Sequence, residues 1–524
     1  MTTRRFAWAA VILAVLAHPW LYAGFFAGDA EIHLVYGESA AAGRFFQFNP
    51  GETSPGVTSP GYMLLVASLF AVIPARFVPV ILVGLGYVAW YLLLLLVYKH
   101  LRRAGLERRW AVLGGVVLGL LPGTAYNSVV GMENVLFASL MLAWLLLAFR
   151  WGYFEPQGAS SRGGLAKELA LGAALGLSVW IRPEAAFLEA VAIVYGLVLA
   201  ASERRLAGAI GPTVWSASSF LLLVGALAGF HHHYTGVWLP GSGKARIMMA
   251  SLESFSFGPV RVDPKFTVRL LMYLPLTAFA AVGYSRTIRA VRNGEKRTAE
   301  VVYGLILGVY FMLYTFVFGA AHLARYTIFL MPLVVMPAVI GVKVFWEGAV
   351  LARMGRFTVP VLLGAALFLG AVFAIEMKLR TEQGGSRRSL ANAMAAPENR
   401  KAASDRLMAE LGAQWARPVV LAYQEVQARY RLDERFTIRS LDGRVDPVLL
   451  RFFHDGSFDH VGYLRVRKVD YLMAYPNYNR DPAEWALSSL ARLKPGESAI
   501  RDGLRFEKLA SAGNITRIEL VGSP

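Results

Sequence analysis

The chain has 524 residues, of which 56% are hydrophobic, and its formal net charge is +18. Ordinary soluble proteins are about 45–50% apolar, so this composition indicates a membrane protein. Cysteine is absent, which excludes disulfides, iron–sulfur clusters and cysteine-based zinc sites. Much of the lysine and arginine lies in short loops between apolar runs, as the positive-inside rule produces. We therefore expect membrane lipids as partners and no nucleic acid.

The apolar runs up to residue 376 predict eleven membrane-spanning helices, because a span needs about 20 apolar residues. The first run is longer than the about 7–15 apolar residues of a signal peptide. We expect it to be an uncleaved helix, with a cleaved signal peptide as the alternative. The fifth run is short and is interrupted by Arg182-Pro183-Glu184. The expected spans are 6–27, 77–98, 110–127, 133–149, 168–181, 185–201, 208–230, 267–285, 300–319, 325–345 and 357–376.

The apolar segment 61–74 is not counted as a span. As a helix it would reach only about 21 Å, short of the about 30 Å hydrocarbon core. If it lies flat in the membrane interface, all the large basic loops fall on the side of Arg4 and Arg5, as the positive-inside rule requires. We therefore expect a multi-pass protein of the plasma (inner) membrane, with a cytoplasmic N-terminus and an outer-face, periplasmic C-terminal domain. The basic loops concerned are 99–109, 204–205, 286–297 and 353–356.

Residues 377–524 are mixed in polarity and look soluble. Strands that alternate with helices predict a small α/β domain. The expected fold is thus a polytopic α-helical membrane domain at 1–376, with an interfacial helix in its first outer loop, followed by a soluble α/β domain at 377–524. The expected elements are helices at 404–415 and 482–493, strands at 418–423, 469–475 and 516–521, and a polar linker at 381–388.

With this topology, several charged and polar residues gather at the outer ends of the spans. Two acids and two or three bases on one membrane face suit a lipid phosphate, because arginine binds phosphate through two hydrogen bonds and lysine acts as a point charge. The residues concerned are Asp29, Glu31, His33, Asn127, Glu133, Arg182, Glu184, His231–His233, Lys244, Arg246, His322 and Arg325.

Each of these residues also has a simpler interpretation. Asp29 is then a solvated acid at a helix end, Arg182 extends to the lipid headgroups, and Glu133 is a first-turn acid favoured by the helix dipole. His231–His233 would form an interfacial cluster rather than a metal site, because consecutive histidines on a helix point in different directions.

Taken in chain order, these motifs resemble membrane glycosyltransferases of the C superfamily that use polyprenyl-phosphate sugars. The likeness is greatest to the branch that contains the mycobacterial terminal arabinofuranosyltransferase. Each motif is weak alone, but their common order is fairly specific. Two positions depart from the family pattern: Gly28 replaces one of the usual acidic pair, where Glu31 could compensate, and Gly241 replaces an asparagine. The matching segments are Asp29-Ala30-x-Ile32, Gly43, Phe48-Asn49-Pro50-Gly51-Glu52, Val57-Thr58-Ser59-Pro60, Gly131-Met132-Glu133, Arg182-Pro183-Glu184, Leu239-Pro240 with Lys244, His322-x-x-Arg325-Tyr326, Leu330-x-Pro332-Leu333 and Leu441-Asp442-Gly443-x-x-Asp446-Pro447.

The resemblance implies an inverting transfer of a sugar from a polyprenyl phosphate to an acceptor hydroxyl of a cell-envelope glycan, lipid or protein. It makes Asp29 the general base. It also implies that Arg325 and Lys244 stabilise the leaving phosphate, with Arg182 as a weaker candidate. Substrate contacts are also expected from Glu31, Glu133, His322 and Tyr326.

Two questions stay open at this point. The acids Asp29, Glu31 and Glu133 could hold a divalent cation, Mg²⁺ or Mn²⁺, through oxygen ligands, although basic residues alone could handle a monophosphate. The alternative function is that of a polytopic transporter or flippase of polyprenyl-linked sugars, but such a protein usually shows internal repeats, and none is evident here.

Overall fold

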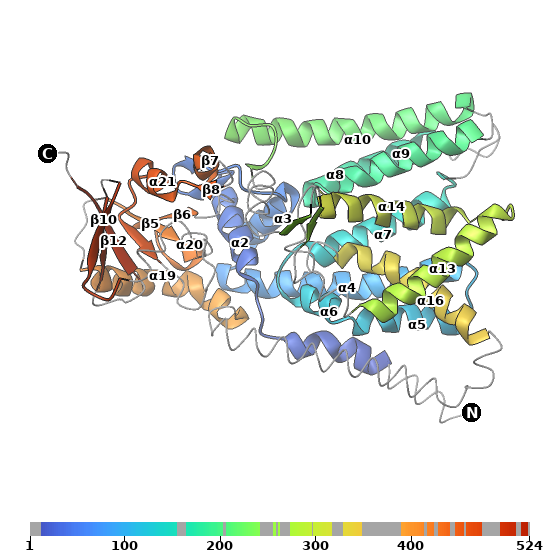
Figure 1. Ribbon diagram of the computed structural model, residues 1–524, viewed down its shortest axis with the longest axis horizontal. Coiled ribbons are helices and arrows are strands. Elements are labelled where there is room, and N and C mark those ends of the chain that lie inside the picture. The colour runs from blue at the N-terminus through green and yellow to red at the C-terminus, as the bar shows by residue number, and fades with distance from the viewer. Residues whose placement is uncertain are drawn as a thin grey trace. The chain divides into compact units, whose positions relative to one another are not determined.

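A computed structural model gives the fold of the protein (Figure 1). The residues it describes are 12–154, 164–202, 206–241, 255–257, 260–262, 273–295, 297–316, 328–347, 389–412, 417–423, 428–440, 446–454, 457–473, 493–502, 504–509 and 515–521.

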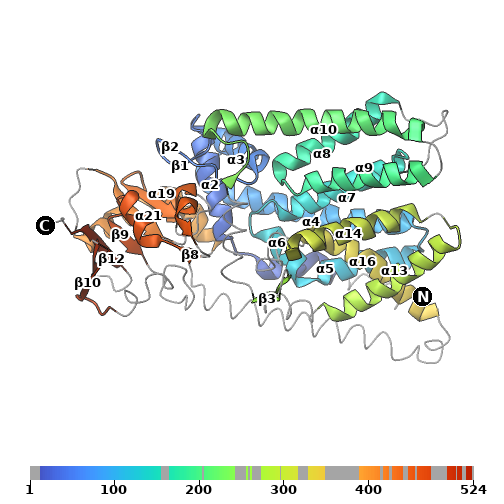
Figure 2. The same ribbon diagram turned by 45° about the horizontal axis from the view of Figure 1, so that its top comes forward.

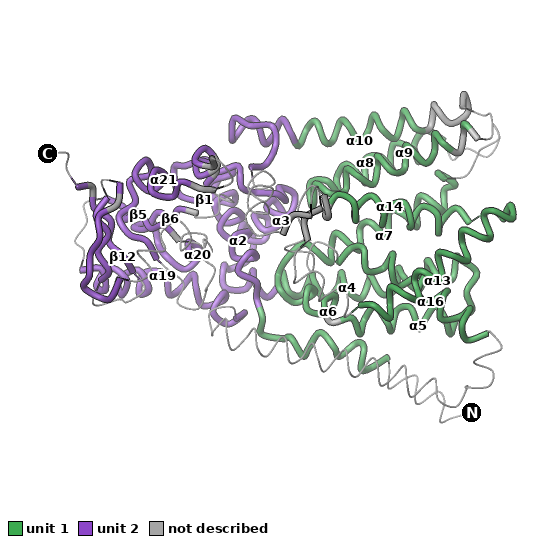
Figure 3. Tube along the Cα trace, in the orientation of Figure 1, with its two compact units in different colours: residues 1–25, 82–227, 254–382 green, residues 26–81, 228–253, 383–524 purple. Residues whose placement is uncertain are grey.

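The chain divides into two compact units, each built from three separate stretches of sequence (Figure 3). Unit 1 contains Met1–Phe25, Leu82–Leu227 and Ser254–Glu382. Unit 2 contains Phe26–Ile81, Ala228–Glu253 and Gln383–Pro524. The first outer loop of the expected topology therefore belongs to the same unit as the C-terminal residues. The membrane-domain boundary expected at residue 376 stays a prediction, since compactness and membrane insertion are different criteria.

Unit 1 is a bundle of apolar helices, in which α8 and α9 run side by side in both views (Figures 1 and 2). Its core is formed by large buried side chains such as Trp90, Phe137 and Phe329. Small residues let two helices approach closely, as is common between membrane helices: a Cβ atom on Gly283 would lie 2.0 Å from the Pro337 carbonyl oxygen. The helices are η1 (His18–Tyr22), α4 (Val78–Arg103), α5 (Arg108–Leu120), α6 (Pro122–Val129), α7 (Asn134–Arg150), α8 (Leu165–Ile181), α9 (Ala185–Ser202), α10 (Leu206–Thr235), α13 (Leu274–Arg292), α14 (Thr298–Phe316), η3 (Ile328–Leu330) and α16 (Met331–Glu347), with a short hairpin of β3 (Phe255–Phe257) and β4 (Val260–Val262); α4 begins and α10 ends in unit 2.

These helices agree with most of the expected spans to within a few residues. Within the described ranges, three helices are long and apolar enough to cross a membrane: Ala75–Arg103, Thr213–Thr235 and Ile328–Glu347. The shorter apolar helices include Asn134–Arg150 and Ala185–Val198. The total of eleven spans stays a prediction, and its last member, 357–376, lies outside the described residues.

The span expected at 110–127 is not one straight helix. It is divided into α5 and α6, which meet at an angle of 64°. Leu121 between them has an extended backbone, with φ −67° and ψ 117°. The cause is Pro122, because proline lacks an N–H group and disfavours the helical conformation of the residue before it.

Unit 2 contains a six-stranded mixed sheet with the strand order β10-β11-β12-β9-β5-β6. β5 is parallel to β6 and β9, whereas the pairs among β9, β12, β11 and β10 are antiparallel. This sheet confirms the expected α/β character of the C-terminal part. Its elements are α19 (Leu390–Leu411), β5 (Val419–Tyr423), α20 (Ala428–Arg431), β6 (Phe436–Ser440), η5 (Pro447–Phe452), β7 (Phe453–His454), β8 (Ser457–Phe458), α21 (His460–Val466), β9 (Tyr471–Met473), β10 (Ser498–Arg501), β11 (Leu504–Lys508) and β12 (Ile515–Leu520).

The sequence predicted part of this arrangement. The strands expected at 418–423, 469–475 and 516–521 are β5, β9 and β12, and the helix expected at 404–415 overlaps the second half of α19. β6, β10 and β11 were not expected. The helix at 482–493 and the linker at 381–388 lie outside the described residues.

The N-terminal part of unit 2 holds two helices, α2 (Gly28–Ala41) and α3 (Pro60–Val72), joined through the short strands β1 (Gln47–Asn49) and β2 (Glu52–Thr53) and followed by η2 (Ala75–Phe77). α3 corresponds to the segment expected at 61–74. α2 and α3 pack closely, because Gly37 faces Val66 with no room for a Cβ atom. The side chain at the end of α3, Val72, is 78% exposed; the interfacial position of this helix stays a prediction.

Candidate functional site

In unit 1, the side chain of Arg182 lies between two carboxylates. Arg182 caps the C-terminus of α8 with an extended backbone, as expected for a residue before proline. Its Nη2 atom donates to Glu184 Oε1 at 2.8 Å, and its Nε atom donates to Glu184 Oε2 at 3.3 Å. Its Nη1 atom lies 3.4 Å from Glu133 Oε1, and the side chains of Arg182 and Glu133 are only 5% and 4% exposed. Arg182 is therefore buried and ion-paired rather than extended into solvent.

Neutral polar groups complete this cluster. The Nη1 atom of Arg182 also donates to Asn134 Oδ1, and the Asn134 amide donates to Asn127 Oδ1 at 3.0 Å. The hydroxyl of Tyr310 on α14 donates to the backbone carbonyl of Glu184. The cluster thus connects α6, the start of α7, the end of α8, the start of α9 and the inner part of α14.

The charge balance of the cluster limits what it can do. One guanidinium group faces two carboxylates, Glu133 and Glu184, so these three side chains carry a net charge of about −1 when ionised. Among the described residues, these carboxylates suit the hydrogen-bond donors of a hydroxyl group.

In unit 2, Asp29 and Glu31 occupy the first turn of α2, where the helix dipole favours acids. Asp29 is partly exposed, whereas Glu31 is completely buried. The Glu31 carboxylate accepts two hydrogen bonds from Arg431 at the end of α20, from Nη2 at 2.5 Å and from Nε at 3.1 Å. Glu31 is thus held by an arginine 400 residues further along the chain.

A second acid of α2 repeats this arrangement two turns later. Glu38 accepts hydrogen bonds from Nη1 and Nη2 of Arg400 on α19, at 2.8 and 2.6 Å. Arg400 also donates from Nε to the Tyr430 carbonyl at 2.8 Å and lies 5.0 Å from the centre of the Tyr430 ring.

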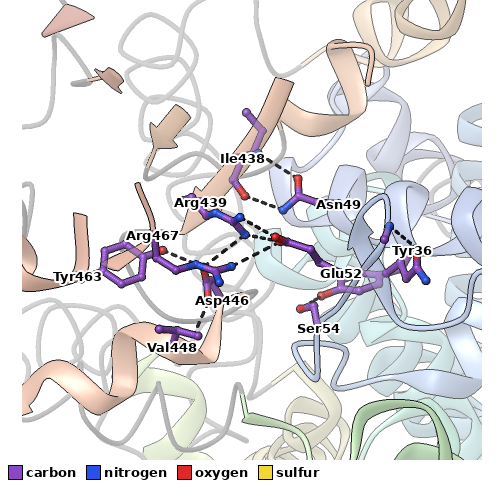
Figure 4. A network of polar contacts seen from close by, with 12 residues as sticks. Tyr36, Asn49, Glu52, Ser54, Ile438, Arg439, Asp446, Val448, Tyr463 and Arg467 are labelled. Carbon is purple, nitrogen blue, oxygen red and sulfur yellow. Dashed lines mark hydrogen bonds and ion pairs between the residues drawn. The ribbon is translucent and has the colours of Figure 1, made fainter. Parts of the chain in front are cut away.

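The hairpin after α2 is bound to the central sheet through a third set of polar contacts (Figure 4). Asn49 donates to the carbonyl of Ile438 at 2.9 Å and accepts from the same residue's N–H at 3.0 Å, as a neighbouring strand would. Glu52 accepts a bidentate pair of hydrogen bonds from Arg439, one of them 2.7 Å long. These contacts lie directly beside β6.

Two further groups extend this network. Arg467 lies 3.4 Å from Glu52 and 2.9 Å from Asp446, and the hydroxyl of Tyr463 donates to Asp446 at 3.0 Å (Figure 4). The hydrogen bond from Arg439 lowers the pKa of the Glu52 carboxyl below its ordinary value, although burial acts in the opposite direction. Two acids and two arginines balance, so the network joins segments rather than presenting free charge.

The remaining sequence-predicted site residues are distributed as follows. Glu133 and Arg182 are brought together, whereas Glu31 is paired with Arg431, which was not expected. Asp29 lies on α2. The others, Lys244, His322, Arg325 and Tyr326, lie outside the described residues.

The three consecutive histidines of α10 turn to different neighbours. His231 Nδ1 lies 2.7 Å from the Val237 carbonyl, His232 stacks on Trp238 and His233 contacts the ring of Tyr234. Across the described part of the chain, no group of three or more His, Asp or Glu side chains is placed to hold a metal ion. Glu31 and Glu133 each contact an arginine, which would compete with a cation for these carboxylates.

The unexpected residues of unit 2 are its arginines, Arg400, Arg431, Arg439 and Arg467. Sequence patterns did not identify them because three of their acids, Glu31, Glu38 and Glu52, lie several hundred residues away. Asp446 was the one available sign, since it belongs to the C-terminal segment quoted for the family resemblance.

Comparison with solved structures identifies the fold. The chain is similar to ArnT from Cupriavidus metallidurans bound to undecaprenyl phosphate, with a TM-score of 0.53, 13% identity and coverage of 100% of both chains. It is also similar to the Archaeoglobus fulgidus oligosaccharyltransferase in its apo form, with a TM-score of 0.56, 12% identity and coverage of 89% of this chain and 69% of the other.

The chain has the glycosyltransferase C fold. A further match is the oligosaccharyltransferase AglB from Archaeoglobus fulgidus in complex with an inhibitory peptide and a dolichol-phosphate, with a TM-score of 0.52, 11% identity and coverage of 90% and 69%. No protein-family model and no curated protein sequence matches the chain. The resemblance to the C superfamily is thus confirmed at the level of the fold, and the glycosyltransferase C fold together with the apolar helices identifies a membrane protein. The arabinofuranosyltransferase branch stays a prediction.

Proposed function

We propose that this protein transfers a sugar from a polyprenyl-phosphate donor to an acceptor hydroxyl at the outer membrane–water interface, with inversion. The observation that carries the proposal is the full-length likeness in fold to ArnT bound to undecaprenyl phosphate. The ordered motifs of the sequence support it. The structural matches lend no support to the alternative of a transporter or flippase.

Asp29 is the proposed general base. A sugar hydroxyl is a weak nucleophile, and a carboxylate within about 2.6–3.2 Å of it can accept its proton as the new bond forms, an effect of about 10²–10⁴ on the rate. The acceptor oxygen then bonds to the anomeric carbon while the bond from that carbon to the phosphate oxygen breaks. The electron pair leaves with the polyprenyl phosphate, and a single displacement of this kind inverts the anomeric centre.

The leaving phosphate needs positive charge beside it as the glycosidic bond breaks. We assign this role to Arg325 and Lys244, with Arg182 as a weaker contributor, and substrate contacts to His322 and Tyr326. Arg325→Ala should weaken donor binding, measured by titration with a polyprenyl-phosphate sugar. An unchanged affinity would assign the phosphate to other residues.

Glu133 and Glu31 have proposed roles in orienting the acceptor or the sugar. The cluster around Glu133 supports this role, since Glu133 and Glu184 lie side by side at Arg182 and their carboxylates can accept hydrogen bonds from hydroxyl groups. A further part of the proposal is that Asp29, Glu31 and Glu133 bind Mg²⁺ or Mn²⁺. A wild-type enzyme that keeps its activity in excess EDTA would exclude this metal site.

The remaining parts of the proposal concern the membrane. They comprise eleven spans in the plasma (inner) membrane, a cytoplasmic N-terminus, an interfacial α3 at the lipid entrance and a periplasmic C-terminal part that binds an acceptor of the cell envelope. The glycosyltransferase C fold and the apolar helices support a membrane protein in general. From the resemblance to the arabinofuranosyltransferase branch, we propose that the transferred sugar is a pentose or a hexose.

The deciding experiment compares sugar release by the purified wild-type protein and Asp29→Asn in detergent, with a panel of polyprenyl-phosphate sugars and candidate acceptors. Transfer that requires Asp29 would support both the class and the base. Glu398→Gln is the matched control, because Glu398 is an exposed acid of unit 2 that pairs with Arg76 on the surface. An active Asp29→Asn enzyme would overturn the base, and wild-type protein that transfers no sugar from any donor would overturn the function.

A further inference from the structure

The acids of α2 that pair with arginine lie on one face of the helix. Glu31 and Glu38 are seven residues apart, which is almost two full turns at 3.6 residues per turn. Each is held by two hydrogen bonds from a single guanidinium, Glu31 by Arg431 and Glu38 by Arg400. Two such forks on one helix face restrict rotation of α2 about its own axis.

Asp29 lies on another side of the same helix. Two residues separate it from Glu31, which corresponds to about 200° around the axis. The packing on α3 is also away from the arginine side, since His33 contacts the ring of Tyr62 at 5.1 Å and Gly37 faces Val66. α2 is thus fixed from two sides, by arginines on one and by α3 on another.

Of the two acid–arginine pairs on α2, the one nearer Asp29 contains the more buried acid. Glu31 has no exposed surface, and the Arg431 side chain is 27% exposed, whereas the side chains of Arg400 and Glu38 are 22% and 35% exposed. Removing one partner of a buried pair leaves a charge without compensation, which is costly. Loss of the Arg431 fork should therefore disturb the first turn of α2, which carries both Glu31 and Asp29.

We propose that Arg431 of the C-terminal part is a positioning residue for the Asp29 carboxylate, acting through the bidentate pair with Glu31. The inference rests on the proposed function, in which Asp29 is the base, and it assigns Glu31 to this pair instead of to the substrate. The C-terminal part then contributes to the reaction itself, by holding the helix that carries the base, besides any binding of the acceptor.

The test is a double-mutant cycle on sugar transfer with Glu31→Ala, Arg431→Ala and the double variant. If Glu31 acts through Arg431, each single variant lowers kcat by about 10²-fold, as a displacement of about 1 Å in a catalytic group does. The KM for the donor stays within about twofold, and the double variant loses no more than the worse single variant. Arg431→Lys should recover part of kcat. Losses that multiply in the double variant would mean that Glu31 and Arg431 act separately and would overturn the proposal.

Glu38→Ala is the matched control. It removes a bidentate pair from the same face of α2 but two turns away from Asp29, and it leaves the contacts of Arg400 with Tyr430 in place. We expect a kcat within about threefold of wild type, since the effect of a misplaced turn falls off with distance from the reacting atoms. Equal losses in Glu38→Ala and Glu31→Ala would show a general loss of structure and would overturn a specific positioning role.

Hydrogen exchange separates this inference from the proposed function. In the full-length protein in detergent, Arg431→Ala should speed the exchange of the amides of residues 31–36 more than Glu38→Ala does. If the wild-type protein proves inactive but this exchange pattern is found, the function fails and the hold of Arg431 on α2 is supported. Unchanged exchange in Arg431→Ala overturns the inference whatever the activity.

Discussion

The polar clusters of the two units use the same chemistry, arginine against carboxylate, in different proportions. In unit 1, Arg182 is shared between Glu133 and Glu184, and all three lie at neighbouring helix ends. In unit 2, three acids between residues 28 and 60 bind arginines of the C-terminal part, such as Glu31 with Arg431. The first arrangement concentrates negative charge in a small buried volume, and the second joins distant segments without leaving free charge.

The difference suggests separate duties for the two clusters. A buried cluster of charges is costly to maintain, since desolvation opposes it, and such clusters are common at functional sites. Balanced pairs of acid and arginine cost less and fix geometry. Mutations can test this contrast. An arginine that is shared by two acids keeps one carboxylate partner when the other acid is removed, whereas an arginine paired with a single acid loses that partner.

The largest effect is expected for Arg182→Leu. This change removes the guanidinium that both Glu133 and Glu184 contact, and breaking a buried ion pair from one side costs about 3–5 kcal/mol of stability. The measurement is the thermal unfolding temperature of the purified protein in detergent, together with the yield of monodisperse protein. Arg182→Lys, which keeps the charge but loses the fork, should be intermediate. A stable Arg182→Leu protein would show that the acids are protonated or solvated, and the contrast between the units would disappear.

The next effect is expected for Asn49→Ala in unit 2. The change leaves the N–H and carbonyl of buried Ile438 without the two hydrogen bonds that Asn49 now makes, and an unsatisfied buried group costs about 1–3 kcal/mol. Thermal unfolding in detergent measures the loss. Gln47→Ala is the control, because the Gln47 side chain accepts an exposed hydrogen bond from the Gly51 N–H. Equal losses in the two variants would contradict the role of Asn49 as a substitute strand partner.

A smaller effect is expected for Glu133→Gln. Arg182 keeps its bidentate pair with Glu184, and the new amide oxygen can still accept a hydrogen bond, so the loss of stability should be about 0.5–1.5 kcal/mol. Both variants should be measured in one unfolding series. A smaller loss of stability for Glu133→Gln than for Arg182→Leu would support an arginine that is shared by two acids. A loss as large as that of Arg182→Leu would be inconsistent with a shared arginine.

The smallest effect is a pH dependence from Glu52. Its folded-state pKa is lowered from 4.5 by the hydrogen bond from Arg439, so its contribution is fully present above the unfolded-state pKa and is lost as the pH falls through the lower folded-state pKa. The unfolding temperature of wild type should therefore fall by slightly more than that of Glu52→Gln as the pH is lowered from about 5 to about 3. The difference is small because the Glu52 side chain is 41% exposed and solvent screens the pair. Identical pH profiles would remove Glu52 from the stabilising contacts of unit 2.

Much of unit 1 could be predicted from the sequence because its helices follow from local apolar runs. The runs at 133–149, 168–181 and 185–201 became α7, α8 and α9 with only small changes at the ends. The exception is the run at 110–127, which Pro122 divides into α5 and α6. The meeting of Glu133 and Arg182 was also anticipated, because both lie at helix ends on the same side of the expected topology.

Unit 2 was less predictable. Its strands β6, β10 and β11 are short, and sequence alternation in such short segments is weak evidence. The partners of Glu31, Glu38 and Glu52 were missed for a different reason: nothing in a single sequence shows which arginine, several hundred residues away, will face a given acid.

The sequence by itself determined the membrane class, the positions of most helices, the α/β character of the C-terminal part and the presence of acids and bases at helix ends. These properties follow from hydrophobic burial and from local backbone preferences, which act within one or two turns. Only the tertiary structure decided that Arg182 is shared by two acids, that Arg431 holds Glu31, and that the first outer loop is bound to the C-terminal sheet. Ion pairs and hydrogen bonds act over about 3 Å, and the folded chain alone determines which groups come that close.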